Sequence, residues 1–280
     1  MNVLLTGRNG QVGWELARTL PPAEVLSTGR AELDLADADA IRRVMREVRP
    51  QLIINAAAYT AVDKAESEPE LAMRINGTAP DVLAEEAKRL GAMLVHYSTD
   101  YVFDGTKPTA YVEDDAPNPL SVYGRTKLAG ERAIQASGCR HLILRTSWVY
   151  GPRGKNFYLT IAARAAKGDP LRVVADQRGV PTTSAFLAES TRALLAKDAS
   201  GLLHLVPAGE TTWYGFAREI VSLTGSRSEV QPIKTGEFPA AARRPANSVL
   251  DNRKAAAVLG EMPQWRELLQ GVTKSGEGVR

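Results

Sequence analysis

The sequence contains few of the residues that bind metals or form disulfides. Its 280 residues include one cysteine, Cys139, and three histidines, His96, His141 and His204. One thiol cannot form an internal disulfide or a cysteine-rich zinc site. The three histidines are widely spaced, so the sequence does not indicate a histidine-based metal centre. We interpret Cys139 and His96 as residues packed within the core.

Charge and hydropathy exclude further classes of protein. Lys and Arg exceed Asp and Glu by only 3 residues, and no basic run is present, so we expect no nucleic-acid partner. No stretch approaches the roughly 18 apolar residues of a membrane span. The first residues lack the basic start and apolar segment of a secretory signal. The sequence therefore predicts a cytoplasmic globular protein with no membrane partner.

The first half of the chain alternates short apolar runs with helical patterns. We expect strands at 3–5, 25–27, 52–54, 93–97 and 141–145, and helices at 14–20, 38–48, 70–90 and 123–137. This alternation is typical of an α/β fold with a doubly wound (Rossmann) parallel sheet, which binds a dinucleotide. We assign this NAD(P)-binding domain to residues 1–150.

The pattern changes after Gly151-Pro152. Helices are expected at 156–167, 185–196 and 213–224, and strands at 171–174 and 202–206. We interpret residues 151–280 as a smaller, mixed C-terminal domain that binds the substrate. Segments near 180–206 are candidates for a return to the main sheet.

Three glycines lie between the first expected strand and the first helix. Gly7, Gly10 and Gly13 form a GxxGxxG spacing, one residue longer than the common dinucleotide fingerprint. Glycine permits the tight turn, the close approach of the backbone to a pyrophosphate, and the packing of helix on strand. The helix N-terminus adds free N–H donors and partial positive charge. Alone, the triplet would be an ordinary turn, but in this position it predicts a pyrophosphate site.

The end of the second strand normally binds the adenosine ribose of a dinucleotide. Arg30 stands there, and arginine accommodates the 2′-phosphate of NADPH. A solvated surface arginine is the alternative interpretation. Asp34 and Leu35 are placed to contact the adenine. Glu32 is close enough to weaken a strict preference, so NADH stays a possible second coenzyme.

Tyr123 and Lys127 have the spacing most informative about chemistry. Four residues along a helix place both side chains on one face, with a rise of roughly 6 Å between them. A lysine cation favours tyrosinate, so we expect Lys127 to lower the pKa of Tyr123 and to hold the nicotinamide ribose. Tyr123 could then act as the general acid in ketone reduction. Ser98 and Thr99 come directly after a core strand, and either hydroxyl could polarise the substrate carbonyl.

Together, and in this order, these motifs resemble the extended short-chain dehydrogenase/reductase family. Longer segments resemble its dTDP-4-dehydrorhamnose reductase branch; they are residues 10–16, 55–66, 96–103, 123–131, 145–150, 176–182 and 244–248. The resemblance implies NADPH- or NADH-dependent reduction of the 4-keto group of dTDP-4-dehydro-6-deoxy-L-mannose. The implied product is dTDP-L-rhamnose, a precursor of cell-wall and surface polysaccharides such as lipopolysaccharide O-antigen.

The resemblance also implies roles for individual residues. The implied catalytic residues are Thr99, Tyr123 and Lys127. The implied cofactor-binding residues are Gly7, Gly10, Gln11, Val12, Gly13, Arg30, Asp34, Leu35, Ala58, Tyr59, Thr60, Tyr97, Tyr123 and Lys127. The implied substrate-binding residues are Thr99, Asp100, Tyr123, Trp148 as an apolar wall for the sugar, and Arg244, with Arg243 less securely, for the pyrophosphate.

Some members of this family dimerise through Mg²⁺ held by carboxylates at the subunit interface. Glu15 matches one such ligand, but Ala185 and Phe186 stand where the partner carboxylate is expected. We therefore expect no metal site: Glu15 is only a weak candidate ligand and is better interpreted as a solvated helix residue. The sequence leaves a monomer and a homodimer open.

Two alternative functions are compatible with the same motifs. One is another nucleotide-sugar 4-ketoreductase, epimerase or dehydratase of the family, and the other is a non-catalytic dinucleotide-binding regulatory subunit. A regulatory subunit would not need Tyr123 and Lys127, and both are present. We interpret the charged segment 63–68 as a solvated cluster, and Trp213 and Trp265 as packing residues.

Overall fold

A computed structural model of the chain describes residues 2–274 and contains one large parallel sheet. Its strands are β1 (Val3–Thr6), β2 (Val25–Thr28), β3 (Leu52–Asn55), β4 (Met93–Thr99), β5 (Arg140–Thr146) and β10 (Gly201–His204). They are arranged in the order β10-β5-β4-β3-β1-β2, and every neighbouring pair is parallel. All five strands expected in the first half are confirmed. The chain reverses its direction of winding between β1 and β3, and open α/β sheets bind ligands beyond such a point.

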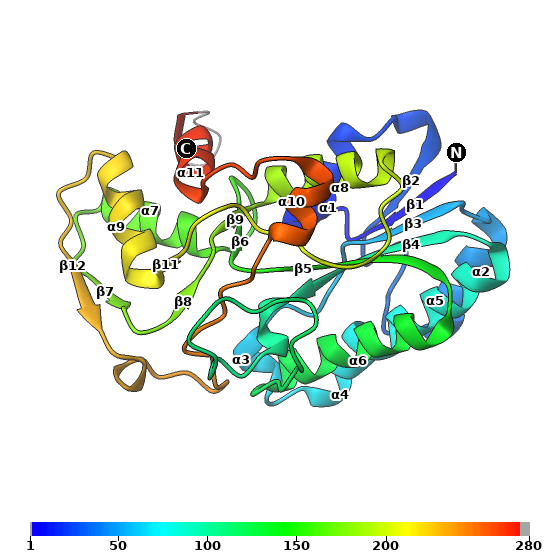
Figure 1. The fold of residues 1–280 in the computed structure, drawn as a ribbon, viewed down its shortest axis with the longest axis horizontal. Coiled ribbons are helices and arrows are strands. Elements are labelled where there is room, and N and C mark those ends of the chain that lie inside the picture. The colour runs from blue at the N-terminus through cyan, green and yellow to red at the C-terminus, as the bar shows by residue number, and fades with distance from the viewer. Residues whose placement is uncertain (1, 275–280) are drawn as a thin grey trace.

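Helices cover both faces of this sheet (Figure 1). One face carries α1 (Gln11–Thr19), α8 (Ser184–Ala196) and α10 (Arg253–Leu259), and the other carries α2 (Ala38–Val48), α5 (Ala79–Leu90) and α6 (Val122–Ser137). Side chains alternate between the two faces. Leu5 and Val95 belong to the core with Leu16 of α1, whereas Leu4 and Ile53 belong to the core on the opposite face. The predicted doubly wound α/β sheet is confirmed.

The single helix expected over 70–90 is interrupted. The segment forms α4 (Pro69–Met73), a π-turn labelled η2 (Arg74–Thr78) and then α5. Pro80 lacks an N–H, so it cannot donate to the carbonyl of Asn76 in a regular helix. Gly130 of α6 packs against that carbonyl, where an added Cβ would lie 2.3 Å from the oxygen. The interruption therefore brings α6 close to the α4–α5 segment. The short helix α3 (Val62–Ala65) was not predicted.

A smaller group of elements lies beside the sheet, to the left in Figure 1. It contains α7 (Phe157–Ala166), α9 (Trp213–Leu223), α11 (Trp265–Lys274) and the parallel pair β7 (Leu171–Val174) and β12 (Val230–Ile233). Two further pairs are β6 (Val149–Tyr150) with β9 (Thr182–Thr183) and β8 (Arg178–Gly179) with β11 (Thr211–Thr212). Single 3₁₀ turns are η1 (Pro22–Glu24), η3 (Asp100–Val102) and η4 (Thr235–Glu237). Tyr158, Phe216 and Trp265 form the core of this group.

The second half of the chain does not stay within this smaller group. Strand β10 pairs with β5 at the edge of the main sheet, and α8 packs against α1. The proposed domain boundary at residue 150 stays a prediction, and residues 275–280 of the proposed second domain lie outside the described residues. None of the helices described between residues 2 and 274 is long and apolar enough to cross a membrane.

Candidate active site

The glycine loop between β1 and α1 approaches its neighbours closely. Gly7 has a φ of +78°, and an added Cβ there would lie 2.7 Å from the backbone nitrogen of Ala57. An added Cβ at Gly13 would lie 2.1 Å from the carbonyl oxygen of Gly7. The N-cap of α1 is Gly10, which has no side chain to cap the helix. The first N–H groups of α1 are thus free for an anion, and the loop fits a pyrophosphate.

Replacing Gly13 by Ala is expected to weaken NADPH binding at least about ten-fold. The new methyl group overlaps the Gly7 carbonyl, so the loop must move away from the helix, and such overpacking costs about 1–3 kcal/mol. Fluorescence titration with NADPH measures the change. Gly271→Ala is the matched control, because no described atom lies within 4 Å of a Cβ at Gly271. Equal affinities in the two variants would contradict the role assigned to the loop.

The end of β2 is organised by a residue that the sequence analysis did not single out. Arg8 pairs with Glu32 at 2.6 Å and donates to the carbonyl oxygen of Ser27 at 3.0 Å. Glu32 accepts a hydrogen bond from the backbone N–H of Gly29, and this bond together with Arg8 lowers the pKa of its carboxyl group. Arg30 is 75% exposed and lies 3.5 Å from Asp34. Two guanidinium groups and two carboxylates therefore lie near the end of β2, where the ribose is expected.

The residues after β3 are fixed to the helices that follow them. The N–H of Tyr59 donates to Asn76 Oδ1 at 2.8 Å, and its hydroxyl donates to Glu68 at 2.7 Å. Thr60 is exposed and Ala58 is partly exposed. The side chain of Tyr97 points the other way, since its hydroxyl lies 2.7 Å from that of Thr191 in α8. The predicted cofactor residues 58–60 are therefore partly accessible, whereas the ring of Tyr97 belongs to the core.

Thr99, Tyr123 and Lys127 meet where β4 ends and α6 begins. Thr99 is the last residue of β4, and its hydroxyl lies 3.1 Å from Asp100 Oδ1 and hydrogen-bonds to Tyr123. Ser121 caps α6 by accepting from the N–H of Gly124. At Gly124 an added Cβ would lie 2.2 Å from the Tyr101 carbonyl oxygen, so only glycine permits this close approach of α6 to η3. Thr99 and Tyr123 are thus neighbours, and Lys127 reaches the same strand at the Tyr97 carbonyl.

The electrostatics of Tyr123 differ from the expectation. Burial raises the pKa of its hydroxyl to about 12, while the hydrogen bond with Thr99 lowers it and the Asp100 carboxylate raises it. The expected lowering by Lys127 is not found. The ammonium of Lys127 instead lies 2.6 Å from the Tyr97 carbonyl oxygen and 3.0 Å from His96 Nε2. The Lys127 ammonium is therefore hydrogen-bonded to groups of β4.

Asp100 and Trp148 have distinct surroundings. Burial raises the pKa of the Asp100 carboxyl to about 7, against the lowering effect of the Ser248 and Thr99 hydroxyls. Trp148 has a φ of +47°, which is unusual for a bulky residue. Its indole stacks on Trp213 at 3.6 Å, and a Cβ at Gly179 would lie 2.4 Å from it. The indole is therefore held in one orientation, and Trp213 is confirmed as a packing residue.

Arg244 has a partner that the sequence analysis missed. Its guanidinium lies 2.7 Å from Asp63 Oδ2, and Asp63 Oδ1 accepts from the backbone N–H of Ala242 at 3.0 Å. The Arg244 hydrogen bond holds the pKa of Asp63 below its usual value. Asp63 in α3 therefore fixes the C-terminal segment that carries Arg244.

The charged segment 63–68 is largely exposed, as expected, but its carboxylates also bind other parts of the chain. Asp63 binds Arg244, Glu66 accepts from the N–H of Val122 at the start of α6, and Glu68 accepts from the hydroxyl of Tyr59. These contacts connect the segment to the region of Arg244, to the start of α6 and to Tyr59 after β3. The sequence did contain a signal, because most of the segment lies within 55–66, one of the segments that carry the family resemblance.

Glu15 is not a solvated residue. It is 3% exposed and pairs with Arg18, one turn further along α1, at 3.0 Å. The expected exposure is wrong because Arg18 and the packing of α1 enclose the carboxylate. Among residues 2–274, no group of three or more His, Cys, Asp and Glu side chains is arranged to hold a metal ion.

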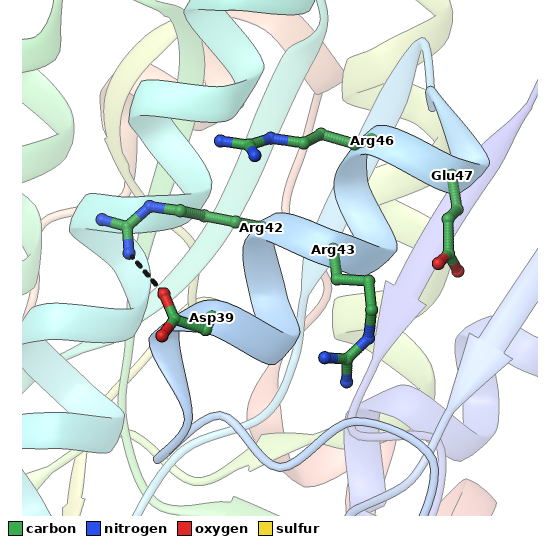
Figure 2. A pocket seen from close by; sticks show the side chains of 5 residues that line it. All are labelled: Asp39, Arg42, Arg43, Arg46 and Glu47. Carbon is green, nitrogen blue, oxygen red and sulfur yellow. Dashed lines mark hydrogen bonds and ion pairs between the residues drawn. The ribbon is translucent and has the colours of Figure 1, made fainter.

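A surface hollow on α2 contains none of the predicted site residues. Figure 2 shows the side chains that line it, namely Asp39, Arg42, Arg43, Arg46 and Glu47. Arg42 lies 3.4 Å from Asp39 and 3.6 Å from Glu85 of α5, and Arg46 lies 3.4 Å from Glu86. These pairs connect α2 to α5 at the surface, so they serve packing rather than the candidate site.

The fold and this site define the class of the protein. A doubly wound parallel sheet, a glycine loop at the first helix, and a Tyr-x-x-x-Lys helix beside β4 are the architecture of a short-chain dehydrogenase/reductase. Residues 1–277 match the family model described as the RmlD substrate binding domain.

Known proteins identify the family within this class. The dTDP-4-dehydrorhamnose reductases of Burkholderia thailandensis and Escherichia coli K12 are each 44% identical to the chain; both matches cover 95% of it, and 96% and 95% of those proteins. The crystal structure of dTDP-4-dehydrorhamnose reductase from Bacillus anthracis in complex with NADP has a TM-score of 0.94 and 37% identity. It covers 98% of this chain and 100% of that one. The chain belongs to the dTDP-4-dehydrorhamnose reductase family.

Proposed function

We propose that the protein is an NAD(P)H-dependent reductase that converts dTDP-4-dehydro-6-deoxy-L-mannose to dTDP-L-rhamnose. The observation that carries the proposal is the meeting of Thr99, Tyr123 and Lys127 at the end of β4. The similarity to reductases with this name, over 95% of the chain, supports the substrate. A relative from Bacillus subtilis, 39% identical, is named a spore coat polysaccharide biosynthesis protein, which supports a role in surface polysaccharide synthesis.

The glycine loop and the strand ends would hold the coenzyme. The N–H groups at the start of α1 would bind the pyrophosphate, with Gln11 and Val12 beside it. Asp34 and Leu35 would contact the adenine, residues 58–60 the middle of the dinucleotide, and Lys127 the nicotinamide ribose. The bound coenzyme supplies a hydride to C4 of the sugar. NADPH is the preferred coenzyme in this proposal, and NADH is the alternative.

The proton would come from Tyr123. Because burial raises the pKa of its hydroxyl to about 12, the group is protonated at neutral pH and can donate to the substrate oxygen. Thr99, which shares a hydrogen bond with Tyr123, would polarise the same carbonyl. Lys127, whose ammonium contacts the Tyr97 carbonyl and His96, would act by holding the nicotinamide ribose and not by acting on Tyr123.

Three further residues would position the nucleotide sugar. Asp100 would accept hydrogen bonds from the sugar, and the fixed indole of Trp148 would form an apolar wall beside it. Arg244 would bind the pyrophosphate, because a guanidinium matches phosphate oxygens. Asp63 would orient Arg244 for this contact, since the two side chains already form an ion pair.

Arg8 is expected to contribute more than Arg30 to the choice of coenzyme. Arg8 is anchored at the end of β2 by Glu32 and the Ser27 carbonyl, whereas Arg30 is mostly exposed. Arg8→Ala should weaken NADPH about 10–100-fold, the range for a lost hydrogen bond to a charged group, and leave NADH almost unchanged. Arg30→Ala is the matched comparison. Titrations with both coenzymes measure this, and a larger NADPH loss in the Arg30 variant would refute the assignment.

A coupled assay tests the proposed function directly. The purified protein is supplied with dTDP- and UDP-linked 4-keto sugars and with NADPH or NADH. The proposal predicts one NADPH oxidised for each dTDP-4-keto sugar reduced, and dTDP-L-rhamnose as product. An epimerase would turn over without net coenzyme consumption, and a regulatory subunit would show no turnover.

Other expectations from the sequence enter the proposal as predictions. We propose that the protein works in the cytoplasm, as a monomer or homodimer, without a nucleic-acid partner. We also propose that it needs no Mg²⁺. Gel filtration with and without a chelator checks the oligomeric state and its independence of Mg²⁺.

A further inference from the structure

A row of buried polar side chains crosses the sheet beneath the candidate site. The parallel register places Thr6 of β1 beside Asn55 of β3, and Asn55 beside His96 of β4. Thr6 Oγ1 lies 2.7 Å from Asn55 Oδ1, and Asn55 Nδ2 lies 3.1 Å from His96 Nδ1. His96 Nε2 lies 3.0 Å from Lys127 Nζ. We name Thr6, Asn55 and His96 the polar row; it ends on Lys127.

The polar row is inaccessible to solvent. Its three members are each 1% exposed, and Lys127 is 2% exposed. Buried polar groups are costly unless they are hydrogen-bonded, and a buried charge costs more. Lys127 has two such partners, the carbonyl oxygen of Tyr97 at 2.6 Å and the imidazole of His96. His96 is therefore one of the two groups that compensate the buried ammonium on its β4 side.

The proton positions of the polar row depend on the charge of Lys127. Burial and the nearby lysine hold the pKa of His96 well below its usual value, so its ring is neutral and has one acceptor nitrogen. If Lys127 is an ammonium, Nε2 must accept from it, and Nδ1–H then donates to the side-chain oxygen of Asn55. In the structure the Asn55 amide presents its nitrogen to Nδ1, and in this orientation the Nε2–H faces Lys127, which must be a neutral amine. Rotation of one amide thus accompanies the change of charge.

Other charged and titratable groups also face Lys127. Burial lowers the pKa of Lys127 to about 8, and the carboxylate of Glu131 on the same helix opposes this shift. Glu131 is itself held in a bidentate pair by Arg145 of β5. The imidazole of His96 and the backbone carbonyl of Tyr97, both on β4, also lie against Nζ. His96 is the one whose ring nitrogen lies within hydrogen-bonding distance of Nζ.

We propose that His96, oriented by Asn55, is a positioning residue that fixes Lys127 at the end of β4 and accepts a hydrogen bond from its ammonium once the Asn55 amide has rotated. It acts on the reaction through Lys127 and touches neither coenzyme nor sugar. The inference rests on the proposed function, in which charged Lys127 holds the nicotinamide ribose.

Two substitutions at His96 separate positioning from packing. His96→Leu removes the acceptor from Lys127 in a side chain of similar size, whereas His96→Gln keeps an oxygen near the place of Nε2. His204→Leu is the matched control, because His204 is also a fully buried histidine in the sheet, but its ring packs beside Phe103 at 5.9 Å. Asn55→Ala removes the group that orients His96 and leaves the imidazole in place.

The pH dependence of kcat is the readout. An ammonium that loses an acceptor is harder to protonate, so His96→Leu should move the alkaline limit of kcat downward from about pH 8 by about one to two pH units. His96→Gln should restore most of this shift. Asn55→Ala should shift the limit in the same direction by less, and His204→Leu should leave it at the wild-type value. Thermal unfolding shows which variants are folded.

A second measurement separates the failure of the proposed function from the failure of the role assigned to His96. The NADPH dissociation constant of each variant is measured from pH 6 to 10 without sugar, where binding should weaken at the same pH limits. A wild-type protein that reduces no 4-keto sugar would overturn the proposed function, while the binding curves would still test His96. If the wild type is active and the His96→Leu variant keeps the wild-type pH limits, only the present inference is overturned. If His96→Leu does not fold, the same result with Asn55→Ala overturns it.

Discussion

Replacing Tyr123 by Phe lowers kcat by about 10²–10⁴-fold, the contribution of a positioned general acid. The hydroxyl is the one group removed, and it hydrogen-bonds to Thr99 at the end of β4. Because Tyr123 acts on the reacting oxygen and not on the coenzyme, NADPH binding should change by less than about three-fold. Stopped-flow measurement of NADPH oxidation in a single turnover gives the rate of the chemical step, and equilibrium titration gives the affinity.

Tyr158→Phe is the matched control for Tyr123→Phe. Tyr158 is also buried, and its hydroxyl has no hydrogen-bond partner within the described part of the chain. Its removal should therefore leave kcat unchanged and the protein at least as stable. A Tyr123→Phe variant as fast as the Tyr158→Phe variant would show that another group supplies the proton.

Replacing Arg145 by Met lowers the free energy of unfolding by about 3–5 kcal/mol, because it leaves a buried carboxylate without its partner. Arg145 Nε and Nη2 lie 2.9 and 2.7 Å from the two oxygens of Glu131, and the two side chains are 3% and 1% exposed. The guanidinium also lies over the ring of Phe103 at 5.1 Å. Urea denaturation monitored by circular dichroism measures the change.

Two comparisons make this stability prediction specific. The double variant Arg145→Met, Glu131→Leu removes both charges and should recover much of the lost stability. Removing the exposed partner in the Arg253–Asp251 pair, with Arg253→Met, should cost about 1 kcal/mol or less. If Arg145→Met were no more destabilising than the surface variant, the pair could not be the desolvated contact that the structure shows.

Features encoded in short stretches of the chain were predictable from the sequence. The five strands of the first half and the helix 38–48 follow from local patterns. Strand residues alternate or run apolar, and helix spacing places Tyr123 and Lys127 on one face. Boundaries were less accurate, as at 70–90, where Pro80 and the close packing of Gly130 impose a π-turn.

Features that depend on the meeting of distant segments were not predictable. Asp63 and Arg244 are separated by 181 residues, and Arg8 reaches Glu32 only because β1 and β2 are adjacent. His96 was correctly predicted to be buried, but its contact with Lys127 requires the register of β4 against α6. Local patterns in a single sequence do not indicate which distant residues pair.

The expected effect of Lys127 on Tyr123 failed for a physical reason. The sequence argument placed the ammonium about one helical turn from the phenol and assumed that its charge acts on that group. In the structure, Lys127 turns to the Tyr97 carbonyl and His96, while burial dominates the pKa of Tyr123. The spacing along a helix fixes the face of a side chain, but the surrounding acceptors fix where its charge lies.

A crystal structure of the protein with NADPH and a non-reactive dTDP-sugar tests the central claim most directly. The account predicts that the nicotinamide lies beyond the end of β4, with Lys127 Nζ on its ribose and the Tyr123 and Thr99 hydroxyls both within about 3 Å of the sugar's O4. A nicotinamide bound elsewhere, or a sugar whose O4 faces neither hydroxyl, would contradict it.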